Sequence, residues 1–334
     1  MNQAPPTAPA ARGALIHPII AGLVGSLTGF ASSFALVIAG SRAVGADSAQ
    51  AASGLLVLCV VQGSIAIALS LTYRLPISVA WSTPGSAVLV TAAVQLPLLA
   101  LPAIVVWLVL SRLAPRWAVP AAVVATAIAV VVAAGPDWTR GARLAPTFVW
   151  TTPVFDPLVI VSLAVPLYLV TMAGQNIPGF TVLRTFGYEP VPARSILTAT
   201  GVGSAVIAPF GAQTINLSAL SAAIMVGDPH TAKDRRWVAT VTAGTCYILL
   251  GLGAGIAGAL VSASPPILIE SVAGLALLGA LITAVTGALG DPRGRIVAIG
   301  TFLVVASGIV VAGLGSAFWG LVAGAVLWFV LRTA

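Results

Sequence analysis

Long apolar runs separated by short polar stretches constrain the fold of this chain more than any other feature of its sequence. A helix needs about 20 mainly apolar residues to cross a bilayer. The candidate spans are residues 15–40, 52–72, 76–95, 97–113, 117–135, 154–174, 194–210, 211–227, 236–262, 266–286, 295–312 and 314–331. The polar stretches between them are too short for a separate domain. The sequence therefore predicts an all-α polytopic membrane protein.

The distribution of cations predicts how these spans are oriented. Of the 15 Lys and Arg residues, Arg42, Arg140 and Arg143 fall in loops on one side of the membrane. The other side collects Arg12, Arg74, Arg112, Arg116, Arg184, Arg194, Lys233, Arg235, Arg236, Arg293, Arg295 and Arg332. Because cytoplasmic loops are enriched in Lys and Arg, we expect both termini in the cytoplasm of a multi-pass protein of the inner or plasma membrane. Insertion then explains the net charge of +7, and no nucleic-acid partner is expected.

The spans divide into two halves of opposite orientation. Residues 1–14, which are rich in Pro and Ala, are expected to form a disordered cytoplasmic tail. Five spans then lie in residues 15–150 and seven in residues 151–334. Two odd-numbered halves in tandem run in opposite directions through the membrane, which is the condition for an inverted repeat of the transporter kind.

Polar clusters interrupt one span in each half. The first is RLPISVAWSTPGSAVLV, residues 74–90. Thr83 or Ser82 would cap a helix, Pro84 suits the first helical position, and Gly85 allows another backbone to approach closely. This pattern predicts a short extended piece followed by a helix that starts within the membrane.

The second interrupted span is PFGAQTINLSALSAAI, residues 209–224. Thr214, Asn216 and Ser218 offer the equivalent cap, and Asn216 is the best candidate. Helix N-termini attract anions, so two of them meeting near the midplane predict a carboxylate-sized site. The alternative is that each cluster is a kink absorbed by helix packing, since Gly, Ser and Pro are common in membrane helices.

A third polar cluster closes the run 154–174 with the neutral amides of Gln175 and Asn176. It is either part of the substrate site or an ordinary helix end followed by a loop. Ser32 in the first span is a weaker candidate, because small residues there also permit close helix packing. Phe30, Trp81 and Phe210 are candidates for stacking on an aromatic substrate.

The remaining reactive residues do not indicate catalysis. Asp156 and Glu270 lie at the starts of apolar runs, where an interfacial anchor is expected and a proton carrier is the alternative. The two histidines lie near segment ends. Cys59 and Cys246 sit within apolar runs, where inert buried thiols are expected. The residue pattern therefore predicts neither an enzyme nor a cofactor or metal site.

Five motifs resemble one transporter family when they are taken in order. They are AWSTPGSA (80–87), VTMAGQNIPG (170–179), APFGAQTINLSALSAAI (208–224), KDRRW (233–237) and GSAFWGLVAG (315–324). Together they resemble the BenE-type benzoate/proton symporters, which share the seven-plus-seven inverted-repeat fold of uracil, xanthine and sulfate transporters. The resemblance implies interleaved core and gate elements, benzoate or a similar aromatic acid and protons as partners, contact with membrane lipid, and a possible homodimer.

The same resemblance implies which residues form the substrate site. Residues Ser82 to Ser86 are similar to the half of the site on the third helix, and Gln213 to Ser218 to the half on the tenth. Gln175 and Asn176 stand at the eighth-helix position, where uracil relatives carry an acid.

The chain departs from the family in its first half. The family has fourteen segments, and the fourth and fifth are absent here, with about 50 residues missing after Val94. Loss of a pair preserves the orientation of every later segment. The leading hypothesis is a benzoate/proton symporter that works by alternating access. The alternatives are a degenerate, non-transporting membrane protein and a carrier of another small organic anion or nucleobase.

Overall fold

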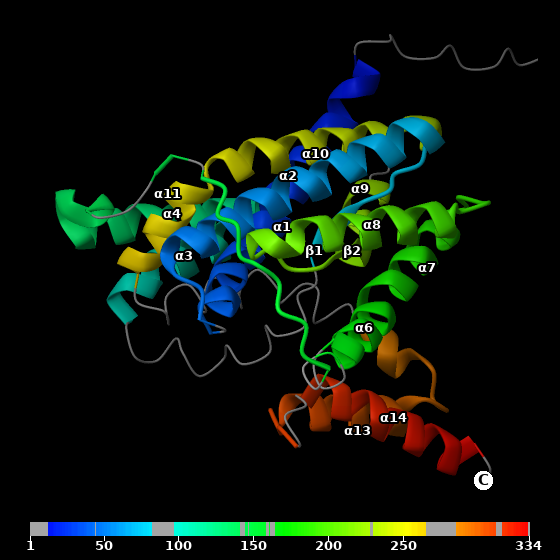
Figure 1. The fold of residues 1–334 in the computed structure, drawn as a ribbon. Coiled ribbons are helices and arrows are strands. Elements are labelled where there is room, and N and C mark those ends of the chain that lie inside the picture. Colours follow the sequence, from blue (N-terminus) through cyan, green and yellow to red (C-terminus); the bar gives the residue numbers. More distant parts are fainter. Residues whose placement is uncertain are drawn as a thin grey trace, which may run out of the picture.

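The computed structural model describes residues 13–43, 45–81, 97–140, 144–145, 147–157, 160, 164–227, 230–264, 285–311 and 316–332. This part of the chain is mainly helical, as predicted (Figure 1). In chain order its main elements are α1 (Gly13–Ala43), α2 (Ser48–Tyr73), β1 (Val79–Trp81), α3 (Pro97–Leu113), α4 (Ala118–Ala134), α6 (Val165–Thr171), the π turn Met172–Asn176, α7 (Ile177–Thr185), α8 (Ala193–Ile207), β2 (Ile215–Leu217), α9 (Ala219–Val226), α10 (Trp237–Leu252), α11 (Ala254–Ala263), α13 (Arg295–Ala306) and α14 (Ser316–Arg332). Short 3-10 turns lie at Pro115–Trp117, Gly135–Thr139, Ala208–Phe210 and Lys233–Arg235.

Length and composition identify few membrane-spanning helices in the described residues. Ser48–Tyr73 is long and apolar enough to cross a membrane, and Lys233–Leu252 together with Ala254–Ala263 would form a second span, bent by 61°. Shorter apolar helices of 10–17 residues lie at Leu15–Ala31, Leu101–Leu113, Ala118–Ala134, Arg295–Ala306 and Phe318–Leu331. The span predicted at 236–262 is therefore two helices that change direction at Gly253.

Helices α2 and α10 lie side by side along the upper edge of the molecule in Figure 1. Their crossing depends on glycine, because a Cβ atom at Gly63 would collide with the carbonyl oxygen of Gly244. Helix α1 approaches α10 in the same way, with Gly22 against the carbonyl oxygen of Ala239. Small residues that allow such close backbone approach are a common basis of helix association in membranes.

Segment ends predicted on the same side of the membrane meet at one end of the bundle. The Arg74 guanidinium lies 4.3 Å from the ring centroid of Trp237. The Tyr73 hydroxyl donates a 2.7 Å hydrogen bond to Ser195 Oγ, and the His17 and His230 rings lie 5.3 Å apart. The first two contacts join the starts of α8 and α10 to the end of α2, and the third joins the start of α1 to the loop that precedes α10.

At the same end of the bundle, two hydrogen bonds join the loop after α7 to the turn Lys233–Arg235. Lys233 Nζ donates a 2.6 Å hydrogen bond to the carbonyl oxygen of Gly187. The Tyr188 hydroxyl donates a 3.0 Å hydrogen bond to the carbonyl oxygen of Lys233. Burial raises the pKa of Tyr188, while the neighbouring Arg236 lowers it less, so this hydroxyl keeps the proton that it donates.

The opposite end of the bundle begins at a capping box. Asp47 Oδ1 accepts hydrogen bonds from the backbone N–H groups of Ala49 and Gln50, and Gln50 Oε1 accepts one from the N–H of Asp47. Nearby, the backbone N–H of Val149 donates a 2.8 Å hydrogen bond to Ser53 Oγ. The loop between the two predicted repeats therefore covers the start of α2.

One predicted span begins a few residues later than expected, and three predicted segments lie mostly outside the described residues. The span predicted at 154–174 is not helical at residues 154–156; the described residues are helical from Pro157, and α6 covers Val165–Thr171. The predicted tail lies almost wholly outside the described residues, as do most of the spans at 76–95 and 266–286.

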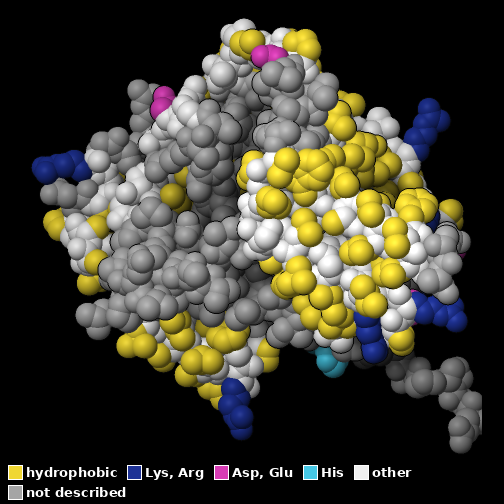
Figure 2. Space-filling view, turned by 90° about the horizontal axis from the view of Figure 1, so that it is seen from below, with side chains coloured by type: hydrophobic (Ala, Val, Ile, Leu, Met, Phe, Trp, Pro, Cys, Tyr) yellow, Lys and Arg dark blue, Asp and Glu magenta, His cyan; other side chains and the backbone are white. Residues whose placement is uncertain are grey.

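Helices α13 and α14 pack against each other and contact the rest of the protein through α6; they form the lower, red layer of Figure 1. The apolar residues exposed on the surface include Val132, Val154, Leu249, Phe302 and Phe329. Figure 2 shows broad hydrophobic areas on one face, with Lys and Arg side chains near the outline. Such a surface suits contact with lipid, since exposed apolar patches of this extent are rare on soluble monomers.

Candidate substrate site at the paired strands

The two predicted interruptions meet as a pair of strands at the centre of the fold. Strands β1 and β2 are antiparallel, with Val79 opposite Leu217, Ala80 opposite Asn216 and Trp81 opposite Ile215. Helix α2 precedes β1 and helix α8 precedes β2, so the same order of elements arrives from both halves in opposite directions. This is the relation that an inverted repeat predicts.

The second half-helix is present and short, as predicted, but its cap is Ser218 and not Asn216. Ser218 has extended backbone angles, and its side chain accepts a 3.3 Å hydrogen bond from the N–H of Ser221 in the first turn of α9. Asn216 is the middle residue of β2, where it is fully buried opposite Ala80. Pairing with β1 keeps Asn216 within the strand, so it cannot begin the helix.

The amide of Asn176 connects a different helix to this strand. Asn176 Oδ1 accepts a 3.0 Å hydrogen bond from the backbone N–H of Leu217, and its Nδ2 lies 3.3 Å from Met172 Sδ. Gly179 lies so close to Leu217 that an added Cβ would sit 2.7 Å from Leu217 Cγ. Asn176 therefore fixes the strand that leads into α9.

The helix does not end at these amides, contrary to the prediction of a span closing at residue 174. It passes through the π turn Met172–Asn176 and continues as α7 to Thr185. Pro178 has no N–H to donate to the preceding turn, and a π turn changes the hydrogen-bond register just before it. Gln175 lies half-buried in the π turn.

The other predicted site residues fall into two groups. Gln213 and Thr214 are half-buried before β2, and Gln213 Nε2 donates a 3.4 Å hydrogen bond to the carbonyl oxygen of Val37 in α1. The second group lies outside what the structure describes: residues Ser82, Thr83, Gly85 and Ser86, and the side chain of Ser32 in α1.

A cluster of aromatic rings borders the strand pair. Trp81 packs edge-on against Phe30, with centroids 6.3 Å apart, and against Tyr247, at 5.8 Å. Phe34 stacks on Phe30 at 5.1 Å. Phe210 is not part of this cluster, because it packs against Phe148 and Trp150 instead.

Tyr247 is the residue that the sequence analysis missed. Its hydroxyl lies beside the side chain of Ser221 in α9 and abuts Gly29 of α1. A tyrosine in the middle of an apolar run is itself a signal, because a buried hydroxyl needs a partner. Tyr247 thus links the ring cluster to the start of α9.

This arrangement places two kinds of recognition side by side. The first turn of a helix has N–H groups without intrahelical acceptors and carries about half a positive charge. In α9 those groups belong to Ala219, Leu220 and Ser221, and Ser218 already occupies one of them. Among the described residues there is no group of three His, Cys, Asp or Glu side chains that could hold a metal ion. The site can therefore contact an anion through the start of α9 and an aromatic ring of a ligand through Trp81.

Comparison with known proteins identifies the family. The family described as "BenE: Benzoate membrane transport protein" matches residues 14–100 and 92–330. "Inner membrane protein YdcO" of Escherichia coli (strain K12) is 33% identical over 376 aligned residues, covering 94% of this chain and 95% of that protein. "Benzoate membrane transport protein" of Acinetobacter baylyi (strain ATCC 33305 / BD413 / ADP1) is 39% identical over 171 residues, 51% of this chain and 43% of that protein.

The same comparisons support the predicted loss in the first half. The alignment with YdcO is longer than the 334 residues of this chain, so YdcO has residues without a counterpart here. The family match also has two parts, and these overlap at residues 92–100, where Val94 lies.

Among solved structures, the overall structure of SLC26A9 is similar with a TM-score of 0.49 and 12% identity, over 97% of this chain and 66% of that chain. The sequence comparisons are the stronger result, because the family match spans most of the chain and YdcO aligns along nearly all of both proteins. This transporter, with its paired strands and ring cluster, belongs to the BenE family of benzoate membrane transport proteins.

Proposed function

We propose that the protein carries an aromatic carboxylate, most simply benzoate, across the cell membrane in symport with protons by alternating access, with both termini in the cytoplasm. The supporting observation is the start of α9 beside the ring cluster, joined to it by Tyr247 and Ser221. A helix start attracts a carboxylate, and aromatic rings provide edge and face contacts for a benzene ring. Benzoate combines both features in one small molecule.

The first half of the chain would supply the second half of the site. Strand β1 ends at Trp81, and the chain continues there into the STPG sequence predicted to start a half-helix. Because Trp81 is paired with Ile215, the chain enters that sequence beside the strand that leads into α9. Alternating access would then move the elements that carry the two half-helices against the remaining helices.

Proton coupling cannot use the residue at the eighth-helix position directly. Asn176 is an amide there, and its oxygen already accepts the N–H of Leu217. A neutral amide does not exchange a proton near neutral pH. The proton would therefore be taken up by the substrate carboxylate or by another group, and a pH gradient measures the coupling without assuming which.

A ligand series on the purified, full-length protein tests the site. Ligands that bind the native state raise its apparent stability, so benzoate is expected to raise the melting temperature in a dose-dependent way. Cyclohexanecarboxylate, which lacks the aromatic ring, and benzamide, which lacks the charge, are each expected to act more weakly. Trp81→Leu should weaken the benzoate effect, whereas Leu249→Ala, on the exposed side of α10, should leave it unchanged. Equal shifts with benzoate and benzamide would contradict the anion site.

Uptake of labelled benzoate into proteoliposomes tests transport itself. We expect accumulation that increases with an inward proton gradient and collapses when a protonophore is added. Benzoate accumulation that does not depend on the proton gradient would contradict symport with protons, but it would not contradict transport of benzoate. Benzoate binding without any uptake would contradict transport and favour the second candidate, a non-transporting family member.

One structural observation favours that second candidate. A two-fold axis that exchanges β1 with β2 also exchanges α2 with α8, and Val61 and Ile65 of α2 lie against Gly203 of α8. On α8, no described residue lies within 4 Å of a Cβ atom added at Gly201. Helix α2 packs against α10, whereas the described part of the chain places no helix against α8 at Gly201. The loss of a core helix predicts this difference.

A further inference from the structure

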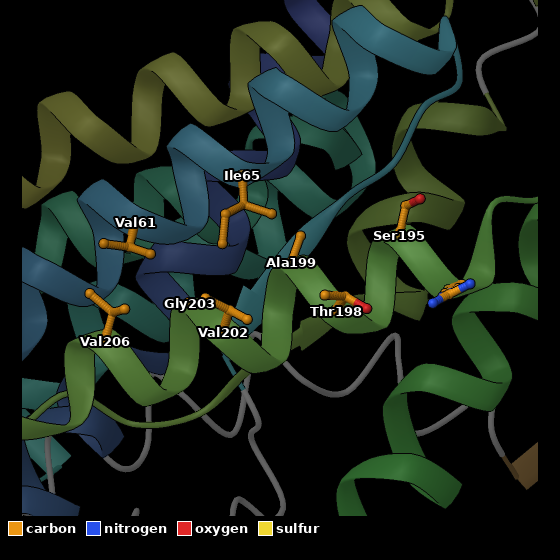
Figure 3. Close-up of a pocket in the computed structure, with 9 residues that line it drawn as sticks. Val61, Ile65, Ser195, Thr198, Ala199, Val202, Gly203 and Val206 are labelled. Atoms are coloured by element: carbon orange, nitrogen blue, oxygen red, sulfur yellow. The ribbon is translucent and has the colours of Figure 1, made fainter.

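A groove runs between α2 and α8 on the outside of the molecule (Figure 3). Its volume is about 840 Å³. Val61 and Ile65 of α2 form one wall, and Val202 and Val206 of α8 form the other. Val202 and Val206 each expose 59% of their surface, so the groove is open to whatever surrounds this face of the protein.

The groove lies apart from the candidate substrate site. Ser204 of α8 turns toward the strands, since its Oγ accepts a 3.0 Å hydrogen bond from the N–H of Ile215. Val202 and Val206 flank Ser204 in sequence and therefore lie on another face of the helix. In a membrane transporter, a valine-lined groove on an outward face contacts acyl chains.

The polar end of the groove carries a single kind of charge. Arg194, Ser195 and Thr198 line this end, and no acidic side chain is among the lining residues. Arg194 is in the first turn of α8, where the helix itself contributes a partial positive charge. The Ser195 hydroxyl accepts a 2.7 Å hydrogen bond from Tyr73, which leaves its own proton for an acceptor. This end is suited to a phosphate or carboxylate oxygen.

The spacing of the two ends suits a lipid. Arg194 and Val206 are separated by twelve positions along α8, which corresponds to about 18 Å of helix. The hydrocarbon part of one leaflet is roughly 15 Å thick. An acyl chain that lies along the valines would thus place its headgroup near Arg194.

We propose that this groove binds one anionic phospholipid, with its phosphate at Arg194, Ser195 and Thr198 and one acyl chain between α2 and α8. The proposal rests on family membership as a membrane protein and not on the nature of the transported substrate. The lipid would fill the space between two helices that touch closely near Gly203 and at the hydrogen bond between Tyr73 and Ser195.

The test compares phosphatidylglycerol with phosphatidylcholine of the same acyl chains, each added to the detergent-purified protein. Bound lipid is counted by native mass spectrometry, and the melting temperature is followed in parallel. We expect one retained phosphatidylglycerol and a larger stabilisation than with phosphatidylcholine. Arg194→Gln should weaken phosphatidylglycerol binding by about fivefold, the typical contribution of one basic residue at an anionic surface.

Two further variants separate the groove from general surface effects. Val206→Trp should fill the groove and abolish the retained lipid, and the exposed Leu249→Trp on α10 is its matched control. Arg184→Gln, at the exposed end of α7, controls for the loss of one positive charge. Equal binding of both lipids, or unchanged binding after Arg194→Gln, would overturn the proposal. A dimer that Val206→Trp disrupts, without any retained lipid, would overturn it in favour of a subunit interface.

Discussion

Asn176 Oδ1 accepts the backbone N–H of Leu217 at 3.0 Å, so a side chain from a π turn satisfies a strand residue two positions before α9 begins. The strand and the helix that carries Asn176 are distant in sequence and are held together at this bond. The buried amide of Asn176 is thus explained first by the backbone that it supports.

Asn176→Ala is expected to lower the free energy of unfolding by about 1–3 kcal/mol, because the N–H of Leu217 would remain buried without its acceptor. Equilibrium denaturation in mixed micelles measures the change. Gln175→Ala is the matched control, since the neighbouring amide is only half-buried. If both variants lost the same stability, the bond to Leu217 would not be the reason for Asn176.

Substitutions at Ser218 separate capping of α9 from anion binding. Asn and Asp are both good caps, whereas Ala is not. Ser218→Ala should cost about 1 kcal/mol of stability. Ser218→Asn should fold and retain the benzoate-induced thermal shift. Ser218→Asp should fold equally well but lose that shift, because its carboxylate repels the ligand at the helix start. A benzoate shift that survived in Ser218→Asp would place the anion elsewhere.

Alanine substitution should have opposite effects at two glycines, Gly63 in α2 and Gly201 in α8. Gly63→Ala forces a Cβ against the carbonyl oxygen of Gly244, and overpacking of this kind costs about 1–3 kcal/mol. Gly201→Ala adds a methyl group where no described residue lies within 4 Å, so the better helix propensity of Ala should leave stability unchanged or raise it by up to about 1 kcal/mol. Melting temperatures of the two variants provide the comparison. A large loss in Gly201→Ala would mean that another helix covers this face.

Gln62 offers a test of a buried polar group in α2. Its side chain is fully buried, and neither amide atom has a hydrogen-bond partner in the described structure. Gln62→Leu has similar volume and should raise stability by about 1–3 kcal/mol, because the desolvation cost of the amide is removed. Gln62→Glu, which adds a charge at the same place, should lower it. A loss of stability in Gln62→Leu would show that the amide has a partner in the folded protein.

The sequence predicts where polar groups enter the membrane better than what each of them does. The cluster at residues 213–218 stands out because Thr, Asn and Ser are uncommon together in an apolar run. Which residue caps the helix depends on where the strand ends, and that is set by pairing of Asn216 with Ala80 from the other half. Only a tertiary contact distinguishes Ser218 from Asn216.

The continuation of the helix past Asn176 is also invisible to local rules. Gly174 and Pro178 are typical of a helix end, and the π turn between them carries the chain through to Thr185. The sequence predicts only part of the ring cluster. Phe30 and Trp81 are candidates, whereas Tyr247 does not stand out among the apolar residues around it in the sequence. Its role is apparent only where α10 meets α9 and α1.

The pairing of β1 with β2 has a consequence for synthesis of the protein. The two strands lie in different halves of the chain, so β1 has no partner strand until the ribosome has passed Leu217. An unpaired strand edge is costly in lipid, because its N–H and C=O groups find no water there. The nascent first half must therefore keep this segment in a hydrated environment, such as the insertion channel, and residence in that channel becomes a measurable step in the biogenesis of this transporter.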